Sequence, residues 1–97
     1  MGYFVFVRFK VKPGTVEKFL TELEKAAKST RTEVGCLQYE YAIDAADDNA
    51  VILFEKYVDQ AAFEVHRSMD YLKSFRGAVA ELFVGVPLII RGSAKTN

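Results

Sequence analysis

The sequence predicts an α+β fold of ferredoxin-like architecture, in which helices cover one face of an antiparallel sheet. Three observations lead to this prediction. Four short segments are rich in β-branched and aromatic residues, and apolar residues alternate along them as in strands. Two longer segments carry apolar residues at helical spacing. The segments follow one another in the order β-α-β-β-α-β, and 97 residues suffice for one domain, spanning 1–97.

The first strand is expected over residues 3–11, where aromatic and β-branched residues predominate. Because successive side chains of a strand point to opposite faces, its residues divide into two sets. The two sets are Tyr3, Val5, Val7, Phe9 and Val11, and Phe4, Phe6, Arg8 and Lys10. Both sets begin with apolar residues, so both faces of the sheet are expected to be covered at that end.

The first helix is expected from residue 16 to about Arg31. Pro13 and Gly14 end the preceding strand, and Thr15 is a suitable N-cap. The residues of the apolar stripe are Val16, Phe19, Leu20, Leu23, Ala27 and Thr30. Charged residues occupy most of the other positions, so the helix is amphipathic and packs one side against the sheet.

A hairpin is expected next, with strands over residues 36–43 and 50–58 joined by a polar turn. The residues expected on one face of the first of these strands are Leu37, Tyr39, Tyr41 and Ile43. In the second strand, Glu55 shares a face with the apolar residues Leu53 and Tyr57.

The second helical segment begins after Asp59, a suitable N-cap, and is expected to break near Ser68. Gly85 is expected to end it. The last strand is expected over residues 86–91, and the small polar residues 92–97 are expected to fray.

The sheet is therefore expected to have two apolar faces but only one set of helices. Of the whole chain, 51% is apolar and 13% aromatic, which exceeds what one small core requires. A second copy covering the bare face is the favoured explanation, and a monomer with apolar edge residues is the alternative.

The composition argues against several functional classes. Thirteen basic and 13 acidic residues balance, so neither nucleic acid nor an anionic membrane is expected as a partner. One cysteine, Cys36, excludes an internal disulfide. The N-terminal apolar run is interrupted by Arg8 and Lys10, which fits neither a signal peptide nor a membrane span. A soluble, cytoplasmic protein is expected.

His66, the only histidine, is the best candidate for chemistry, either as an acid or base facing a cavity or as a packed core residue. Tyr39 and Tyr41 are candidates for a pocket wall, or for core residues with the hydroxyl at an edge. Glu55 is either a buried carboxylate with a raised pKa or half of an intersubunit ion pair, and the ion pair is favoured. Arg76 is a candidate contact for an anionic group, although an exposed arginine is common.

The sequence gives little support for a zinc site, a nucleotide-binding motif or a catalytic cysteine. One histidine and one cysteine do not make a zinc site, and neither a GxGxxG motif nor a P-loop is present. A catalytic pair of Cys36 with His66 is conceivable, but nothing in the sequence places them together, and an inert Cys36 is favoured. No metal and no cofactor are expected.

Three segments resemble the antibiotic biosynthesis monooxygenase family, in particular its YgiN-like quinol monooxygenase group. Residues 33–40 (Glu-Val-Gly-Cys-Leu-Gln-Tyr-Glu) resemble the signature E-x-G-C-x-x-Y. Residues 54–59 (Phe-Glu-Lys-Tyr-Val-Asp), followed by Ala62 and His66, are similar to a second motif. Residues 11–14 (Val-Lys-Pro-Gly) match the usual entry to the first helix. The resemblance covers roughly residues 3–90.

The resemblance implies a homodimer whose two sheets face each other as an α+β barrel, with a substrate pocket between sheet and helices. Several members oxidise quinols or aromatic polyketides with oxygen, without metal or flavin. Others degrade haem, but their Asn, Trp and His are replaced here by Val7, His66 and Arg76, and the chain has no Trp. Haem degradation is therefore not expected.

The expected function is cofactor-independent oxidation of a small quinol-like or phenolic molecule by oxygen. His66 would be catalytic. The substrate would contact Tyr39, Tyr41, Val7, Phe63 and Arg76. Two alternatives stay open: isomerisation of a small phosphorylated carbonyl compound such as a quorum signal, which some members catalyse, and a non-enzymatic module that binds a small ligand.

Overall fold

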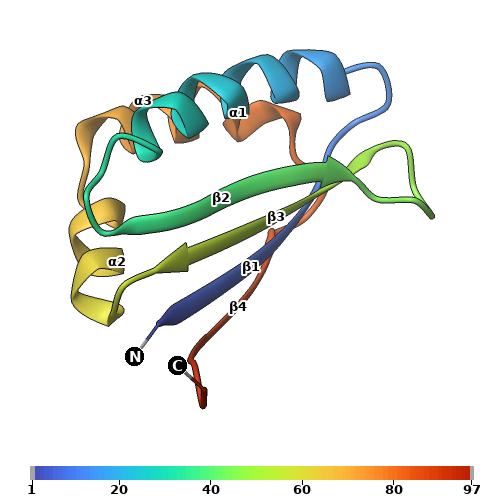
Figure 1. The fold of residues 1–97 in the computed structure, drawn as a ribbon. Coiled ribbons are helices and arrows are strands. Elements are labelled where there is room, and N and C mark those ends of the chain that lie inside the picture. Colours follow the sequence, from blue (N-terminus) through green and yellow to red (C-terminus); the bar gives the residue numbers. More distant parts are fainter. Residues whose placement is uncertain (1, 97) are drawn as a thin grey trace.

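The computed structural model describes residues 2–96. The elements are β1 (Tyr3–Lys10), α1 (Val16–Thr30), β2 (Cys36–Ile43), β3 (Ala50–Tyr57), α2 (Gln60–Arg67), α3 (Asp70–Val79), a 3₁₀ turn (Ala80–Leu82) and β4 (Leu88–Ser93). The strands form one antiparallel sheet in the order β2-β3-β1-β4. In Figure 1, α1 and α3 lie side by side over one face of this sheet, and α2 lies at one end. The predicted ferredoxin-like fold is confirmed.

The inner set of β1 residues faces the helices, as its alternation predicts. Tyr3, Val5, Val7 and Phe9 are all buried, whereas Phe4 and Phe6 on the other face are exposed. An aromatic cluster joins this face to the helices and consists of Phe9, Phe19, Phe75 and Phe83. Burying one such side chain stabilises the fold by about 1.5–3 kcal/mol.

The outer face of the sheet is apolar and open to solvent, as the two apolar sets of β1 predict. Phe6 pairs in register with Phe54 on one side and with Ile90 on the other. Phe6 is 50% exposed and Ile90 is 61% exposed, which is unusual for large apolar residues in the centre of a sheet. That a second copy covers this face stays a prediction.

The helical segment after β3 breaks where the sequence predicts but ends earlier. Ser68 closes α2, and the carboxylate of Asp59 caps that helix by accepting from the backbone N–H of Ala62 at 2.9 Å. The expected continuation to Gly85 is wrong. Phe83 pairs with Val11 in an isolated β-bridge, which draws the chain back to the sheet before Gly85 is reached.

Two strand details also differ from expectation. β4 extends to Ser93, two residues beyond the expected end, because β1 offers pairing partners as far as Tyr3. A register shift between Cys36 and Gln38 leaves Leu37 in a bulge, so Leu37 is exposed and does not share the face of Tyr39. Among residues 2–96, no helix is both long and apolar enough to span a membrane.

Candidate active site

A cavity of about 730 Å³ lies between the inner face of the sheet and the helices α2 and α3. Five of the six predicted site residues line it, namely Val7, Tyr39, Phe63, His66 and Arg76. Most of the remaining wall is apolar and includes Val5, Phe9, Leu53, Leu72, Phe75, Phe83 and Ile89. The volume is that of a site for a small molecule, and the wall suits a flat aromatic ring.

The sheet contributes a row of four residues to the floor of this cavity. Strand pairing places Tyr39 opposite Glu55, Glu55 opposite Val5, and Val5 opposite Arg91. Since directly paired residues point to the same face, all four side chains face the helices. The sheet therefore presents one carboxylate and one guanidinium to the same cavity.

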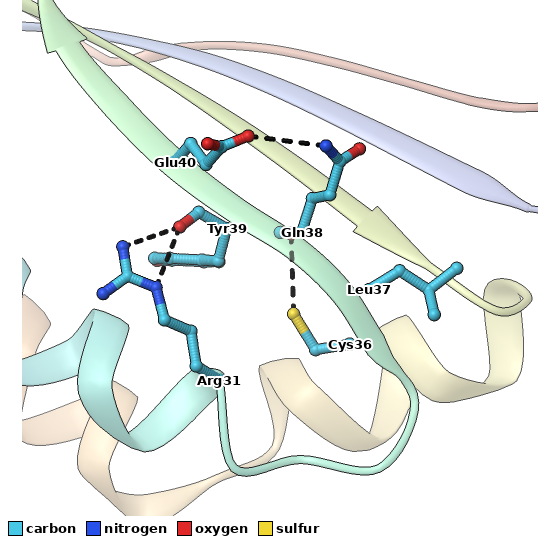
Figure 2. A pocket seen from close by; sticks show the side chains of 6 residues that line it. All are labelled: Arg31, Cys36, Leu37, Gln38, Tyr39 and Glu40. Carbon is cyan, nitrogen blue, oxygen red and sulfur yellow. Dashed lines mark hydrogen bonds between the residues drawn. The ribbon is translucent and has the colours of Figure 1, made fainter.

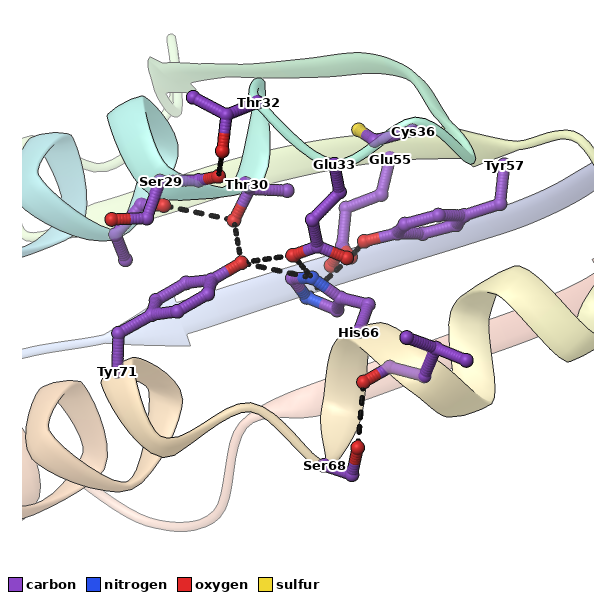
Figure 3. Close-up of polar contacts among 12 residues, drawn as sticks. Ser29, Thr30, Thr32, Glu33, Cys36, Glu55, Tyr57, His66, Ser68 and Tyr71 are labelled. Atoms are coloured by element: carbon purple, nitrogen blue, oxygen red, sulfur yellow. Dashed lines mark hydrogen bonds and ion pairs between the residues drawn. The ribbon is translucent and has the colours of Figure 1, made fainter.

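His66 closes the cavity from the side of α2 and stands between two carboxylates. It is 3% exposed. Its Nδ1 lies 3.0 Å from Oε2 of Glu33, and its Nε2 lies 3.6 Å from Oε1 of Glu55 (Figure 3). A carboxylate can only accept a hydrogen bond, so Nδ1 carries the proton toward Glu33 when the imidazole is neutral. The lone pair of Nε2 then faces Glu55.

The carboxylate of Glu33 is held beside His66 by the hydroxyl groups of Tyr71 and Thr30. Tyr71, near the start of α3, donates a short hydrogen bond to Oε2 of Glu33, and its hydroxyl lies 2.9 Å from that of Thr30 (Figure 3). Thr30 in turn donates to the backbone carbonyl of Ala26 at 2.8 Å. Side chains of α3 and α1 thus fix the carboxylate that orients the imidazole.

The close approach of the loop that carries Glu33 depends on a glycine. A Cβ built on Gly35 would lie only 2.5 Å from the Cβ of Ala62 on α2. The backbone N–H of Val58 also donates to the carbonyl of Gly35 at 2.9 Å. A larger residue at this position would push the loop, and Glu33 with it, away from His66.

Glu55 is a buried carboxylate of the cavity, so the favoured reading as an intersubunit ion pair is wrong. It is 5% exposed on the face that the helices cover. Burial, helped by the nearby charge of Glu33, raises the pKa of Glu55 to about 7, although a hydrogen bond from the hydroxyl of Tyr57 at 2.5 Å opposes the shift. This carboxyl therefore titrates near neutral pH.

The pKa of His66 moves in the opposite direction. Burial lowers it below its ordinary value, and the hydrogen bond from Nδ1 to Glu33 works against this effect. At neutral pH the imidazole is thus neutral beside a partly ionised Glu55, and the titrations of the two neighbouring groups are coupled. A pair poised near neutrality is suited to moving a proton of a bound molecule.

Tyr41 lies apart from the cavity, unlike the other five predicted residues. Its hydroxyl donates a short hydrogen bond to Glu24 of α1. Tyr39 and Tyr41 therefore differ in role although both lie on β2. Tyr39 lines the cavity, whereas Tyr41 links the strand to α1 through its hydrogen bond.

The thiol of Cys36 is hydrogen-bonded to the backbone of its own strand rather than to His66. Burial, together with the charges of Glu33 and Glu55, raises the pKa of this thiol to about 11. The thiol donates a weak hydrogen bond to the carbonyl of Gln38 at 3.5 Å. A protonated thiol is a poor nucleophile, so the inert reading of Cys36 is favoured over a catalytic pair.

A smaller depression of about 310 Å³ surrounds Cys36 at the outer edge of β2 (Figure 2). Arg31 crosses it and donates to the carbonyl of Tyr39 at 2.9 and 3.2 Å. This contact satisfies a carbonyl of the edge strand and joins it to the end of α1. The depression holds no pair of groups suited to proton transfer, so it is not the candidate site.

The sequence does not single out Glu33, Tyr71 or Arg91 as site residues. Glu33 belongs to the segment that carries the family resemblance, which was the one signal available for it. Tyr71 follows the helix break, and Arg91 is the last residue of the expected strand. Among residues 2–96, no group of three or more histidine, cysteine or acidic side chains is placed to hold a metal ion.

The chain resembles several bacterial proteins. "Putative monooxygenase YcnE" of Bacillus subtilis (strain 168) is 32% identical over 73 residues, which cover 75% of this chain and 77% of that protein. "Putative monooxygenase Rv0793" of Mycobacterium tuberculosis is 31% identical over 78 residues, which cover 80% and 76%. "Uncharacterized protein sll1783" of Synechocystis sp. is 32% identical over 66 residues, which cover 68% of this chain but only 45% of that protein.

The fold agrees with these relatives. The solved structure of Rv0793 superposes with a TM-score of 0.91 at 24% identity, and the match covers 100% of this chain and 98% of that one. The family model described as "Antibiotic biosynthesis monooxygenase" matches residues 2–78, which include His66 and its neighbours Glu33, Glu55 and Tyr71. The chain therefore belongs to the antibiotic biosynthesis monooxygenase family.

Proposed function

We propose that the protein is a cofactor-independent monooxygenase that oxidises a small quinol-like or phenolic molecule with molecular oxygen, as in the quinol group of its family. The observation that carries this proposal is the position of His66, buried at the wall of an apolar cavity between Glu33 and Glu55. Such a group can remove the proton of a phenolic hydroxyl, while the aromatic wall holds the ring and keeps water away.

The reaction needs no external reductant. Removing a proton from a quinol gives an electron-rich anion, which can itself transfer electrons to oxygen. For a simple quinol, a ring C–H bond is replaced by a C–O bond, and the products are a hydroxyquinone and one molecule of water. All four electrons that reduce oxygen come from the substrate, so the protein has to bind the ring, remove the proton and exclude solvent.

The roles of the residues follow from their contacts. The 3.6 Å gap between Nε2 of His66 and Glu55 is too long for a hydrogen bond between them, so a substrate hydroxyl can approach both atoms. The pair accepts the proton, and Glu33 keeps the imidazole in place. Val7, Tyr39 and Phe63 would form the wall around the ring, and Arg76 would contact an anionic group. Tyr41, which lies outside the cavity, would take no part.

We also propose that residues 1–97 act as one domain and assemble as a homodimer. The support is the outer face of the sheet, where large apolar side chains of β1, β3 and β4 are exposed together. Arg8 and Lys10 at one end of this face are paired with Asp44 and Asp47, while Lys56 lies opposite Phe4 at the other end and Glu40 lies opposite Phe54. Burying an apolar centre of this kind against a second copy is a usual way to form a dimer.

Isomerisation of a phosphorylated carbonyl compound is the second candidate, because the same pair could move a proton between carbon and oxygen, and Arg76 could meet the phosphate. A module that binds a small ligand without chemistry is the third. Oxygen consumption separates the three: only the monooxygenase consumes it, the isomerase forms product without it, and the binding module shows saturable binding with no product.

The test is oxygen uptake with a panel of quinols, comparing the protein with His66→Ala. We expect turnover of at least one quinol, and a fall in kcat on the order of a hundredfold or more in the variant, because general-base catalysis contributes that much. Gln60→Ala, at the exposed start of the same helix, is the matched control and keeps full activity. Equal rates for the protein and His66→Ala would exclude the role proposed for His66.

A further inference from the structure

We propose that the substrate is an aromatic molecule with an anionic substituent, which Arg76 and Arg91 bind while the phenolic hydroxyl lies at Glu55 and His66. This inference rests on the proposed function, because it assigns a second contact to the same bound molecule. Its support comes from two arginines at the cavity wall whose charges are not neutralised by neighbouring side chains.

Arg91 lines the cavity from β4, and strand pairing sets its distance from Glu55 across the sheet. It belongs to the cross-strand row that also contains Glu55, with the β1 residue Val5 between them. Neighbouring strands lie about 4.8 Å apart, so the backbones at Arg91 and Glu55 are separated by roughly 10 Å. Both side chains project from the same face of the sheet into the cavity, about two strand spacings apart, so one aromatic ligand could contact both.

The guanidinium of Arg91 is held over the aromatic wall. Its central carbon lies 5.1 Å from the centre of the Phe63 ring, within the range of a cation–π contact. Such a contact orients the planar group without using its N–H donors. Those donors are thus available for a ligand placed beside Phe63, and guanidinium groups bind carboxylate and phosphate groups through paired hydrogen bonds.

Arg76 approaches the same space from α3. It lines the cavity, and its positive charge is one of the influences that lower the pKa of His66, which places it within electrostatic reach of the imidazole. A ring with its hydroxyl at His66 would therefore have Arg76 close enough to bind a substituent on the same molecule.

Neither arginine has an acidic partner within the described part of the chain. Among residues 2–96, no carboxylate lies within ion-pair distance of Arg76 or Arg91, whereas the neighbouring Arg67 pairs with Glu64 at 3.3 Å. Glu55 is the one acidic residue that lines the cavity, and its pKa of about 7 leaves it only partly ionised. The cavity wall therefore carries an excess of positive charge that an anionic ligand would balance.

The test is anaerobic titration calorimetry, so that binding is measured without turnover. The ligands are hydroquinone, its carboxylate 2,5-dihydroxybenzoate, and 4-hydroxyphenyl phosphate. We expect at least one of the two anionic ligands to bind about tenfold or more tightly than hydroquinone, because charge-assisted hydrogen bonds are the stronger kind. The preferred anion tells a carboxylate-bearing substrate from a phosphorylated one.

The variants make the inference specific to these two side chains. The double substitution Arg76→Gln with Arg91→Gln should abolish the preference for the anion over hydroquinone. The double substitution Lys73→Gln with Lys95→Gln removes the same charge from exposed positions and should keep the preference. Circular dichroism confirms that each variant is folded.

The results separate this inference from the proposed function. Equal affinity for all three ligands, binding of none of them, or a preference that survives loss of both arginines would each overturn the inference. Oxygen uptake with hydroquinone would still support the monooxygenase in those cases. Conversely, selective anion binding without oxygen uptake by any quinol would uphold the anion site and exclude the monooxygenase.

Discussion

The two faces of the sheet differ in the kind of group that they place among apolar residues. On the inner face, Glu55 lies under the helices beside His66 and accepts a hydrogen bond from the hydroxyl of Tyr57. On the outer face, Phe54, the residue just before Glu55 in the same strand, packs on Phe6 with ring centres 5.1 Å apart. The inner face thus combines burial with titratable groups, whereas the outer face presents an exposed apolar centre with charged residues around it.

This difference shows how a short strand can serve two purposes. Because side chains alternate, a substitution at position 54 alters one face and a substitution at position 55 alters the other. We therefore expect changes on the inner face to affect stability and proton transfer, and changes on the outer face to affect association. Three substitutions test that separation, and they follow in order of expected effect.

Phe19→Ala should cause the largest loss of stability. Phe19 lies on α1, is fully buried and contacts Phe9, Phe75 and Phe83 over the inner face. Truncating a buried phenylalanine costs about 3–5 kcal/mol, because transfer and cavity terms add. Urea unfolding measures the change. Val34→Ala, at a fully exposed position, is the control and should change stability by less than about 0.5 kcal/mol.

Glu55→Gln should alter how stability depends on pH. The folded-state pKa of Glu55 is raised to about 7 from an ordinary value of 4.5, so the folded state holds this proton over a pH range in which the unfolded state has lost it. Stability from this group is therefore complete below about pH 4.5 and is lost as pH rises through about 7. The size of that loss is about 3 kcal/mol.

Urea unfolding of both proteins between pH 5 and pH 8 isolates this contribution. The stability of the unsubstituted protein relative to Glu55→Gln should fall as pH rises. The lowered pKa of His66 acts with the opposite sign, since it makes stability rise as pH increases through its unfolded-state pKa, and it is present in both proteins. A difference that does not vary with pH would show that Glu55 is not buried as described.

Phe6→Asp should weaken association and leave the protomer folded. Phe6 lies in the centre of the outer face, between Phe54 and Ile90. A charge buried at the centre of an interface should raise the dimer dissociation constant on the order of a hundredfold. Sedimentation velocity over a range of concentrations measures this change. Lys28→Asp, on the solvent side of α1, is the control, and an equally weakened control would argue against an interface on this face.

Much of the fold could be predicted because it depends on local periodicity. The alternation in β1 sorted its residues into the two faces, and the break near Ser68 followed from capping residues. The role of Glu55 could not be predicted in the same way. Alternation predicts that Glu55 shares a face with Leu53 and Tyr57. Because both faces of the sheet are apolar, alternation alone does not say which of them the helices cover.

The site was predictable only where a residue type is rare or a resemblance exists. His66 stood out as the only histidine, but its partner Glu33 lies 33 residues away in the sequence and meets it through the packing of a loop on α2. Such contacts have no local signature. The bulge at Leu37 could not be predicted for a related reason. A single extra residue in a strand produces no recognisable change in the alternation of apolar and polar residues.

The most direct test of the account is the pH dependence of kcat/KM for oxygen uptake with an accepted quinol, corrected for the rate without protein. If the Glu55–His66 pair accepts the substrate proton, kcat/KM should rise as pH increases through about 7, the pKa of Glu55, and Glu55→Gln should lose that rise together with most of its activity. An unchanged profile in Glu55→Gln would contradict the proposal that this pair performs the proton transfer.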